Sequence, residues 1–164
     1  MDNRTRMLTE TALLTALITV TGAIKLPGFI PGTEFQLSAP LAVAICAVFG
    51  FRRYMTAGVL SSLMGLILGT QTILNVFIAM VFRIVVGIFI AVFGVSWPIL
   101  ALAGPLGSSV ARLSLGGMLG KAVIPMLMAA VPGMAYTALA AWPLTLILRR
   151  VKVQTEKVIH SVQR

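Results

Sequence analysis

Two arginines stand inside apolar segments in which no neighbouring acid can neutralise them. Arg83 lies in MVFRIVVGIFIAV, residues 80–92, and Arg112 lies in GSSVARLSLGG, residues 107–117. A guanidinium group in the middle of a bilayer costs about 3 kcal/mol on insertion scales. Because guanidinium forms strong bidentate hydrogen bonds with carboxylate and phosphate, the two residues indicate a binding site for an anionic small molecule.

Further polar residues are expected to complete this substrate site. Asn75 lies at the outer end of the segment that carries Arg83, and Tyr136, from the last segment, has a ring that can stack on a ligand. Structural roles remain the alternative for both arginines. Arg83 would then bind backbone carbonyls at a broken helix or pair with Glu34, and Arg112 would lie near the membrane surface.

The longest polar connection between apolar segments is IKLPGFIPGTEFQLSAP, residues 24–40. Its two Pro-Gly pairs are typical of a turn-rich loop. We expect this loop to cover the site, with Glu34 and Gln36 contacting the substrate. The alternative is a simple connector with a solvated glutamate.

The sequence does not indicate catalysis, metal binding or nucleotide binding. Its one cysteine, Cys46, and its one histidine, His160, have no partners for a metal site or a nucleophile–base pair, and no phosphate-binding loop of the G-x-x-x-x-G-K-[ST] type is present. We therefore expect no enzymatic activity, no catalytic residue, no cofactor and no metal.

The composition is that of a membrane protein. The 164 residues are 59% hydrophobic and only 10% charged, with a mean hydropathy of +1.02, whereas soluble domains carry about 25% charged residues. The net charge of +9 does not indicate nucleic acid as a partner, because the basic residues flank apolar segments instead of alternating with aromatic ones. We expect one membrane domain in contact with lipid, residues 1–150, and a basic cytoplasmic tail, residues 151–164.

The apolar segments predict an all-α integral membrane protein, a bundle of six transmembrane helices. The expected segments are Leu8–Ile24, Phe35–Gly50, Tyr54–Gly69, Thr72–Gly94, Trp97–Leu119 and Ala122–Leu148. With six spans both termini share one side, which would hold nine lysines and arginines against two, Lys25 and Lys121, on the other. The positive-inside rule therefore places both termini in the cytoplasm.

Small residues recur on two of the expected helices. Ala12 and Ala16 lie four apart on one face of the first segment. A second small face is formed by Gly58, Ser61, Ser62 and Gly65. Small residues at this spacing let helices approach closely in membranes. Such a face serves either ordinary packing within the bundle or docking of a partner.

The chain resembles the substrate-binding S components of energy-coupling factor (ECF) transporters, which are ABC transporters. The resemblance rests on the six-segment pattern, on Ala12-x-x-x-Ala16, and on the Phe49–Gly50 step that precedes the glycine-bearing third segment, here with Gly58. It implies a bacterial cytoplasmic-membrane protein that binds a vitamin or related micronutrient in an outward-facing pocket. That pocket would be lined by the first loop and by helices four to six.

The resemblance also implies partners. Ala12 and Ala16 would dock on a membrane-embedded T component, which is coupled to two ATPase subunits that hydrolyse ATP. Two other classes remain open. One is a membrane scaffold of the cell-shape machinery type, which needs no ligand, and the other is a small secondary carrier, for which Glu10 is the candidate coupling acid.

Overall fold

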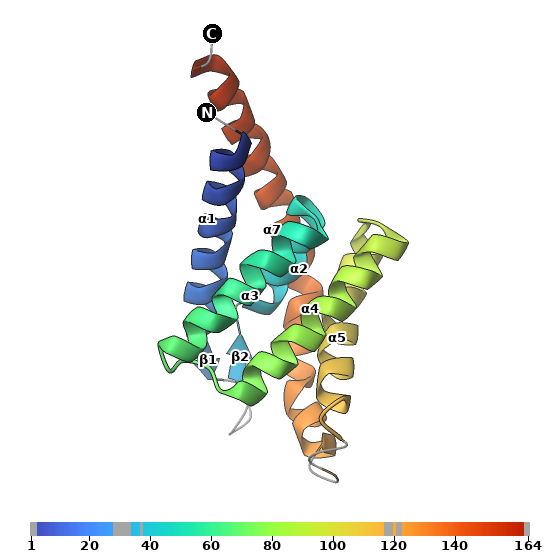
Figure 1. Ribbon diagram of the computed structural model, residues 1–164. Coiled ribbons are helices and arrows are strands. Elements are labelled where there is room, and N and C mark those ends of the chain that lie inside the picture. Colours follow the sequence, from blue (N-terminus) through green and yellow to red (C-terminus); the bar gives the residue numbers. More distant parts are fainter. Residues whose placement is uncertain (1–2, 28–33, 37, 117–119, 121–122, 163–164) are drawn as a thin grey trace.

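The computed structural model describes residues 3–27, 34–36, 38–116, 120 and 123–162. These residues form six helices and one short hairpin (Figure 1). The elements are α1 (Asn3–Ala23), β1 (Lys25–Pro27), β2 (Glu34–Gln36), α2 (Ser38–Phe49), α3 (Phe51–Ile67), α4 (Ile73–Phe93), α5 (Trp97–Leu113) and α7 (Val123–Val162). Each predicted segment overlaps one helix, so the predicted helical architecture is confirmed for this part of the chain.

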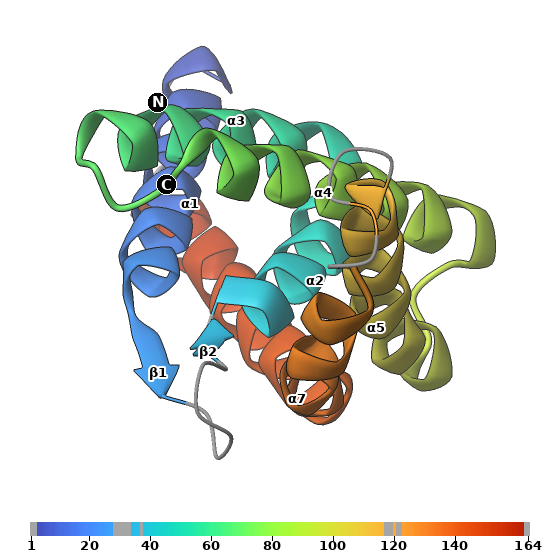
Figure 2. The ribbon, with the colours of Figure 1, turned by 90° about the horizontal axis from the view of Figure 1, so that it is seen from below.

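Helix α2 forms the centre of the bundle. It contacts α1, α3, α4, α5 and α7 (Figure 2), and its residues 40–46 are all buried. Twelve residues span only about 18 Å at 1.5 Å per residue, so α2 is shorter than an ordinary transmembrane helix. Its apolar surface is instead covered by the surrounding helices.

Two helices, α4 and α7, are long and apolar enough to cross a membrane by length and composition. Helix α4 has 21 residues and a mean hydropathy of 2.8. The beginning of α1 and the end of α7 lie at the same end of the bundle (Figure 1), where Arg6 contacts Glu156. The structure therefore brings the beginning of α1 close to the C-terminal part of α7.

The turns between helices follow local signals. Gly50, with φ +84°, joins α2 directly to α3, a conformation that glycine adopts readily. The Thr72 side chain caps α4 by accepting a hydrogen bond from the backbone N–H of Asn75 at 3.3 Å. The first turn orients α3, which carries Tyr54, and the second orients α4, which carries Asn75 and Arg83.

Several boundaries differ from the sequence prediction, beginning with α1, which starts at Asn3 instead of Leu8. Helix α3 begins at Phe51, so Arg52 and Arg53 belong to its first turn rather than to a connecting loop. Helix α7 continues through the basic tail to Val162. In the first loop, β1 and β2 pair antiparallel with Pro27 opposite Glu34, while residues 28–33 and 117–119 lie outside the described part of the chain.

Candidate functional site

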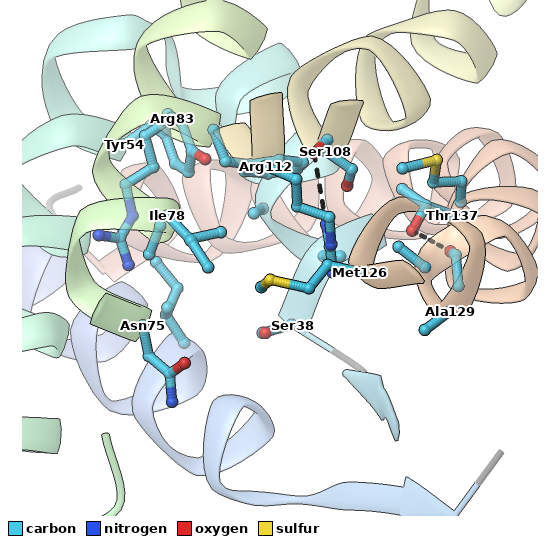
Figure 3. A pocket seen from close by; sticks show the side chains of 18 residues that line it. Ser38, Tyr54, Asn75, Ile78, Arg83, Ser108, Arg112, Met126, Ala129 and Thr137 are labelled. Atoms are coloured by element: carbon cyan, nitrogen blue, oxygen red, sulfur yellow. Dashed lines mark hydrogen bonds between the residues drawn. The ribbon is translucent and has the colours of Figure 1, made fainter. Parts of the chain in front are cut away.

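A cavity of about 350 Å³ lies within the bundle (Figure 3). All six helices contribute to its wall, α1 through Ile18 and α3 through Tyr54. Its volume falls in the range of small-molecule sites, about 300–1,000 Å³. Of the residues predicted to bind substrate, the structure brings Asn75, Arg83 and Arg112 to this one cavity.

Arg83 is held in the wall by α3. Its side chain is almost fully buried, with 5% of the residue exposed. Its Nη1 donates a 2.7 Å hydrogen bond to Ser62 Oγ and a weaker one to Met80 Sδ at 3.7 Å. A Cβ added to Gly58 would lie only 2.4 Å from Arg83 Nε, so the guanidinium occupies the space that this glycine leaves.

Arg112 reaches the cavity from α5. Its Nη1 donates to the backbone oxygen of Ser108 one turn earlier, at 3.3 Å (Figure 3). Among the described residues, neither Arg112 nor Arg83 forms an ion pair with a carboxylate. Because a cation that is removed from water without a counter-charge is costly, the buried Arg83 and the half-buried Arg112 both favour an anionic ligand in the cavity.

Tyr54 is a site residue that the sequence analysis missed. It is completely buried beside Arg83, and its hydroxyl has no hydrogen-bond partner among the described residues (Figure 3). A buried hydroxyl without a partner costs about 1–3 kcal/mol. The available signal was helical spacing, since Tyr54, Gly58 and Ser62 recur every four residues and so lie on one face of α3.

The other predicted site residues are placed differently. Tyr136 is not among the residues that line the cavity, whereas its neighbour Thr137 is, with its hydroxyl donating to the Gly133 oxygen at 2.8 Å. Glu34 and Gln36 belong to β2 by their backbone pairing, and their side chains lie outside the described part of the structure. The predicted contact of these two side chains with substrate stays a prediction.

The predicted docking face of α1 points away from the bundle. Ala12 and Ala16 are exposed, whereas Leu14 and Ile18 on the opposite face are buried. Ile18 also lines the cavity. Helix α1 therefore separates the cavity from an exposed face that carries Ala12 and Ala16.

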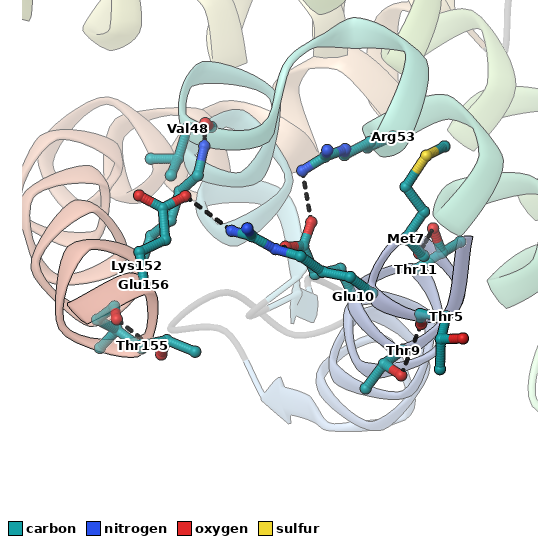
Figure 4. A network of polar contacts seen from close by, with 12 residues as sticks. Thr5, Met7, Thr9, Glu10, Thr11, Val48, Arg53, Lys152, Thr155 and Glu156 are labelled. Carbon is teal, nitrogen blue, oxygen red and sulfur yellow. Dashed lines mark hydrogen bonds and ion pairs between the residues drawn. The ribbon is translucent and has the colours of Figure 1, made fainter. Parts of the chain in front are cut away.

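A network of charged side chains joins three helices at the end of the bundle where the chain begins (Figure 4). Glu10 of α1 accepts hydrogen bonds from Arg6 Nε, at 3.1 Å, and from Arg53 Nη1 of α3. Arg6 Nη2 also contacts Glu156 of α7, at 3.0 Å. The acid that a secondary carrier would need is thus held between two arginines.

A metal centre finds no support in the described residues. They contain no group of three or more histidine, cysteine, aspartate or glutamate side chains that could hold an ion. The cavity instead offers donors of hydrogen bonds and apolar surface, which are the features of a site for an organic anion.

Comparison with known proteins shows that the chain is similar to a protein of known sequence. Protein BioX of Lysinibacillus sphaericus is 51% identical over 141 residues, which cover 86% of this chain and 85% of that protein. No family model and no solved structure matches the chain. Identity at this level along most of both sequences shows common ancestry and a shared fold.

Proposed function

The chain belongs to the same family as Protein BioX, and from this premise we propose that it is the substrate-capture S component of an ECF transporter. In this role it binds a vitamin or a related micronutrient with an anionic group and presents it for uptake. The observation that carries the proposal is the cavity with Arg83 and Arg112 in its wall and no described carboxylate to pair with either.

The cavity wall fits a carboxylate attached to an apolar body. Arg112 has further N–H donors beyond the one bound to Ser108 and can hold a carboxylate through two of them. Ile78, Phe82 and Met126 supply apolar surface, against which an aliphatic chain or a ring can pack. The name of the relative suggests a biotin-related compound, and biotin, a carboxylate on an aliphatic chain, is the first compound to test.

In the proposed topology each of the six helices crosses the bacterial cytoplasmic membrane. The charged network around Glu10 then lies at the cytoplasmic end, in agreement with the positive-inside rule. The cavity lies nearer the opposite end, since Ser38 and Asn75 at the beginnings of α2 and α4 line it. Substrate would therefore enter from outside.

The proposed partners are a T component and two ATPase subunits. The exposed face around Ala12 and Ala16 lets another helix approach closely. ATP hydrolysis is assigned to the ATPase subunits, and this chain contributes binding alone, without a cofactor. Because α1 carries both this face and the cavity residue Ile18, occupancy of the cavity and docking would act on the same helix.

The decisive experiment measures biotin binding to the purified chain in lipid nanodiscs. We expect one bound ligand, and Arg112→Ala should weaken its affinity roughly ten- to hundredfold, because charge-assisted hydrogen bonds are lost. Arg149→Ala, which removes an exposed arginine of α7, is the matched control. Native mass spectrometry of protein released from host membranes, with and without the Arg112 change, extends the test to other anions.

The two alternative functions, a membrane scaffold and a secondary carrier, predict different results in these experiments. A scaffold would release no small molecule and would work equally well after both arginines are replaced. A proton-coupled carrier would transport substrate without ATPase subunits and would lose transport when Glu10 is replaced.

A further inference from the structure

A second, smaller chamber adjoins the main cavity. It has a volume of about 60 Å³ and lies between α1, the α3–α4 turn and α4. Ser38, Asn75 and Arg83 line both spaces, and Thr70 and Gln71 line the small chamber alone. The two spaces are therefore neighbours with Arg83 in the wall of both, and a molecule bound beside Arg112 that extended past Arg83 would reach Gln71.

The amide of Gln71 is held in position, but its oxygen has no hydrogen-bond partner among the described residues. A Cβ added to Gly65 would lie 2.8 Å from Gln71 Cδ, so the side chain fits closely against this glycine. The turn is fixed because the backbone N–H groups of Thr70 and Gln71 both donate to the Gly65 oxygen, at 2.9 and 3.1 Å. The Gln71 Oε1 atom is nevertheless buried with no hydrogen-bond donor among the described residues.

The chamber thus presents one acceptor and several donors. Gln71 Oε1 needs an N–H or O–H group. Arg83 has five N–H donors, and the described residues engage only Nη1, through Ser62 and Met80. A carboxylate satisfies Arg83 but places a lone pair against Gln71 Oε1, whereas an amide or urea offers both a carbonyl oxygen and an N–H group.

We propose that the chamber is a subsite for a neutral amide- or urea-type group of the substrate. Its N–H donates to Gln71 Oε1 and its carbonyl oxygen accepts from Arg83, while the anionic end of the same molecule binds Arg112. This assignment rests on the proposed function. It gives the two arginines separate roles, and it restricts the substrate to molecules with a carboxylate at one end and a neutral donor–acceptor group at the other.

The test compares three probes in lipid nanodiscs by isothermal titration calorimetry. Biotin carries a carboxylate and a cyclic urea, octanoate carries a carboxylate alone, and suberate carries a carboxylate at each end. The wild-type protein should bind biotin most tightly. Gln71→Met should weaken biotin binding roughly tenfold or more, because the urea N–H loses its acceptor, and should leave octanoate binding unchanged.

Gly65→Ala provides a second variant that leaves Gln71 in the chain but displaces its amide. It should repeat the selective loss of biotin affinity. The matched controls are Gln154→Met on the exposed surface of α7 and Gly116→Ala, whose added Cβ would meet Val123 at an ordinary 3.5 Å. Both controls should bind all three probes as the wild type does, and octanoate binding shows that each variant is folded.

Three results would overturn the subsite while leaving the proposed function intact. Equal affinity of the wild type for biotin and octanoate, or biotin binding that is insensitive to Gln71→Met, would mean that the chamber holds only water. Tighter binding of suberate would mean that it takes a second anion. Failure of all three probes to bind the wild type, together with no co-purifying anion in native mass spectrometry, would instead overturn the proposed function, and the subsite with it.

Discussion

Small residues on α3 determine where the polar side chains of Arg83 and Gln71 lie. Gly58 leaves room for the guanidinium of Arg83, and Ser62 gives it an oxygen acceptor. Gly65 leaves room in the same way for the amide of Gln71. The face of small residues that the sequence suggests for helix packing therefore also accommodates buried polar side chains, which are costly to bury without such space and partners.

Gly58→Ala should destabilise the protein and weaken ligand binding together. The new Cβ would lie 2.4 Å from Arg83 Nε, so the guanidinium must move, at an expected cost of about 1–3 kcal/mol. Thermal unfolding in nanodiscs measures the first effect and calorimetric titration the second. Gly116→Ala, with its ordinary contact to Val123, should change neither, and an unchanged Gly58→Ala protein would contradict this position of Arg83.

Ser62→Ala should lower stability by about 1–3 kcal/mol, since it removes the oxygen acceptor from a buried Arg83 nitrogen. The matched control is Ser96→Ala, because Ser96 is exposed and its side chain makes no capping hydrogen bond. Denaturant or thermal unfolding compares the two. If Ser62→Ala were as stable as the control, Arg83 would have another acceptor in the protein.

The two faces of helix α1 have different surroundings, one buried in the bundle and one exposed. Leu14 and Ile18 are buried in the bundle, while Ala12 and Ala16 are exposed. Four-residue spacing places each pair on one face, and the small pair leaves a shallow surface on which a second helix can pack. The same helix thus touches both the substrate cavity and the proposed docking surface.

Ala16→Leu should prevent assembly with the T component and the ATPase subunits without affecting substrate affinity. The larger side chain blocks close helix approach but points away from the cavity. Co-purification of the tagged chain with its partners measures assembly, and titration measures affinity. Ala135→Leu, at an exposed alanine of α7, should assemble normally. Normal assembly of Ala16→Leu would exclude this face as the docking surface.

At the scale of the whole molecule, contacts distant in sequence hold the end opposite the proposed entrance together. Glu10 links α1 to α3 through Arg53, and Arg6 links α1 to α7 through Glu156. Lys152 adds a hydrogen bond from α7 to the Val48 oxygen at the end of α2, at 3.1 Å. These contacts join the ends of four helices far from the cavity, so we expect them to support the bundle rather than to bind substrate.

Glu10→Gln should therefore lower the thermal unfolding midpoint and leave substrate binding unchanged, because it removes the charge that pairs with Arg6 and Arg53. Glu156→Gln, which among the described residues affects only the contact with Arg6, should have a smaller effect on the midpoint. Unfolding and binding measured in the same nanodiscs test both changes. Loss of proton-coupled uptake in Glu10→Gln would support the secondary carrier instead.

Local properties of the sequence were sufficient to predict the helices. Each apolar segment became a helix because hydropathy and turn residues such as Gly50 act over short distances along the chain. The importance of Arg83 and Arg112 was also visible, since a charge within an apolar run stands out without knowledge of its neighbours. The exact helix ends were less predictable, as α3 and α7 show, because terminal turns depend on packing.

Only the tertiary structure decided which side chains meet. Tyr54 and Thr137 line the main cavity and Gln71 lines the small chamber because α3, α4 and α7 cross there. No feature of a single segment reveals that crossing. The same holds for the contact between Arg6 and Glu156, which are 150 residues apart. Hydropathy along the chain specifies which segments are helical, whereas the pairing of their faces depends on shape and hydrogen bonding between distant residues, and these arise only when the bundle is assembled.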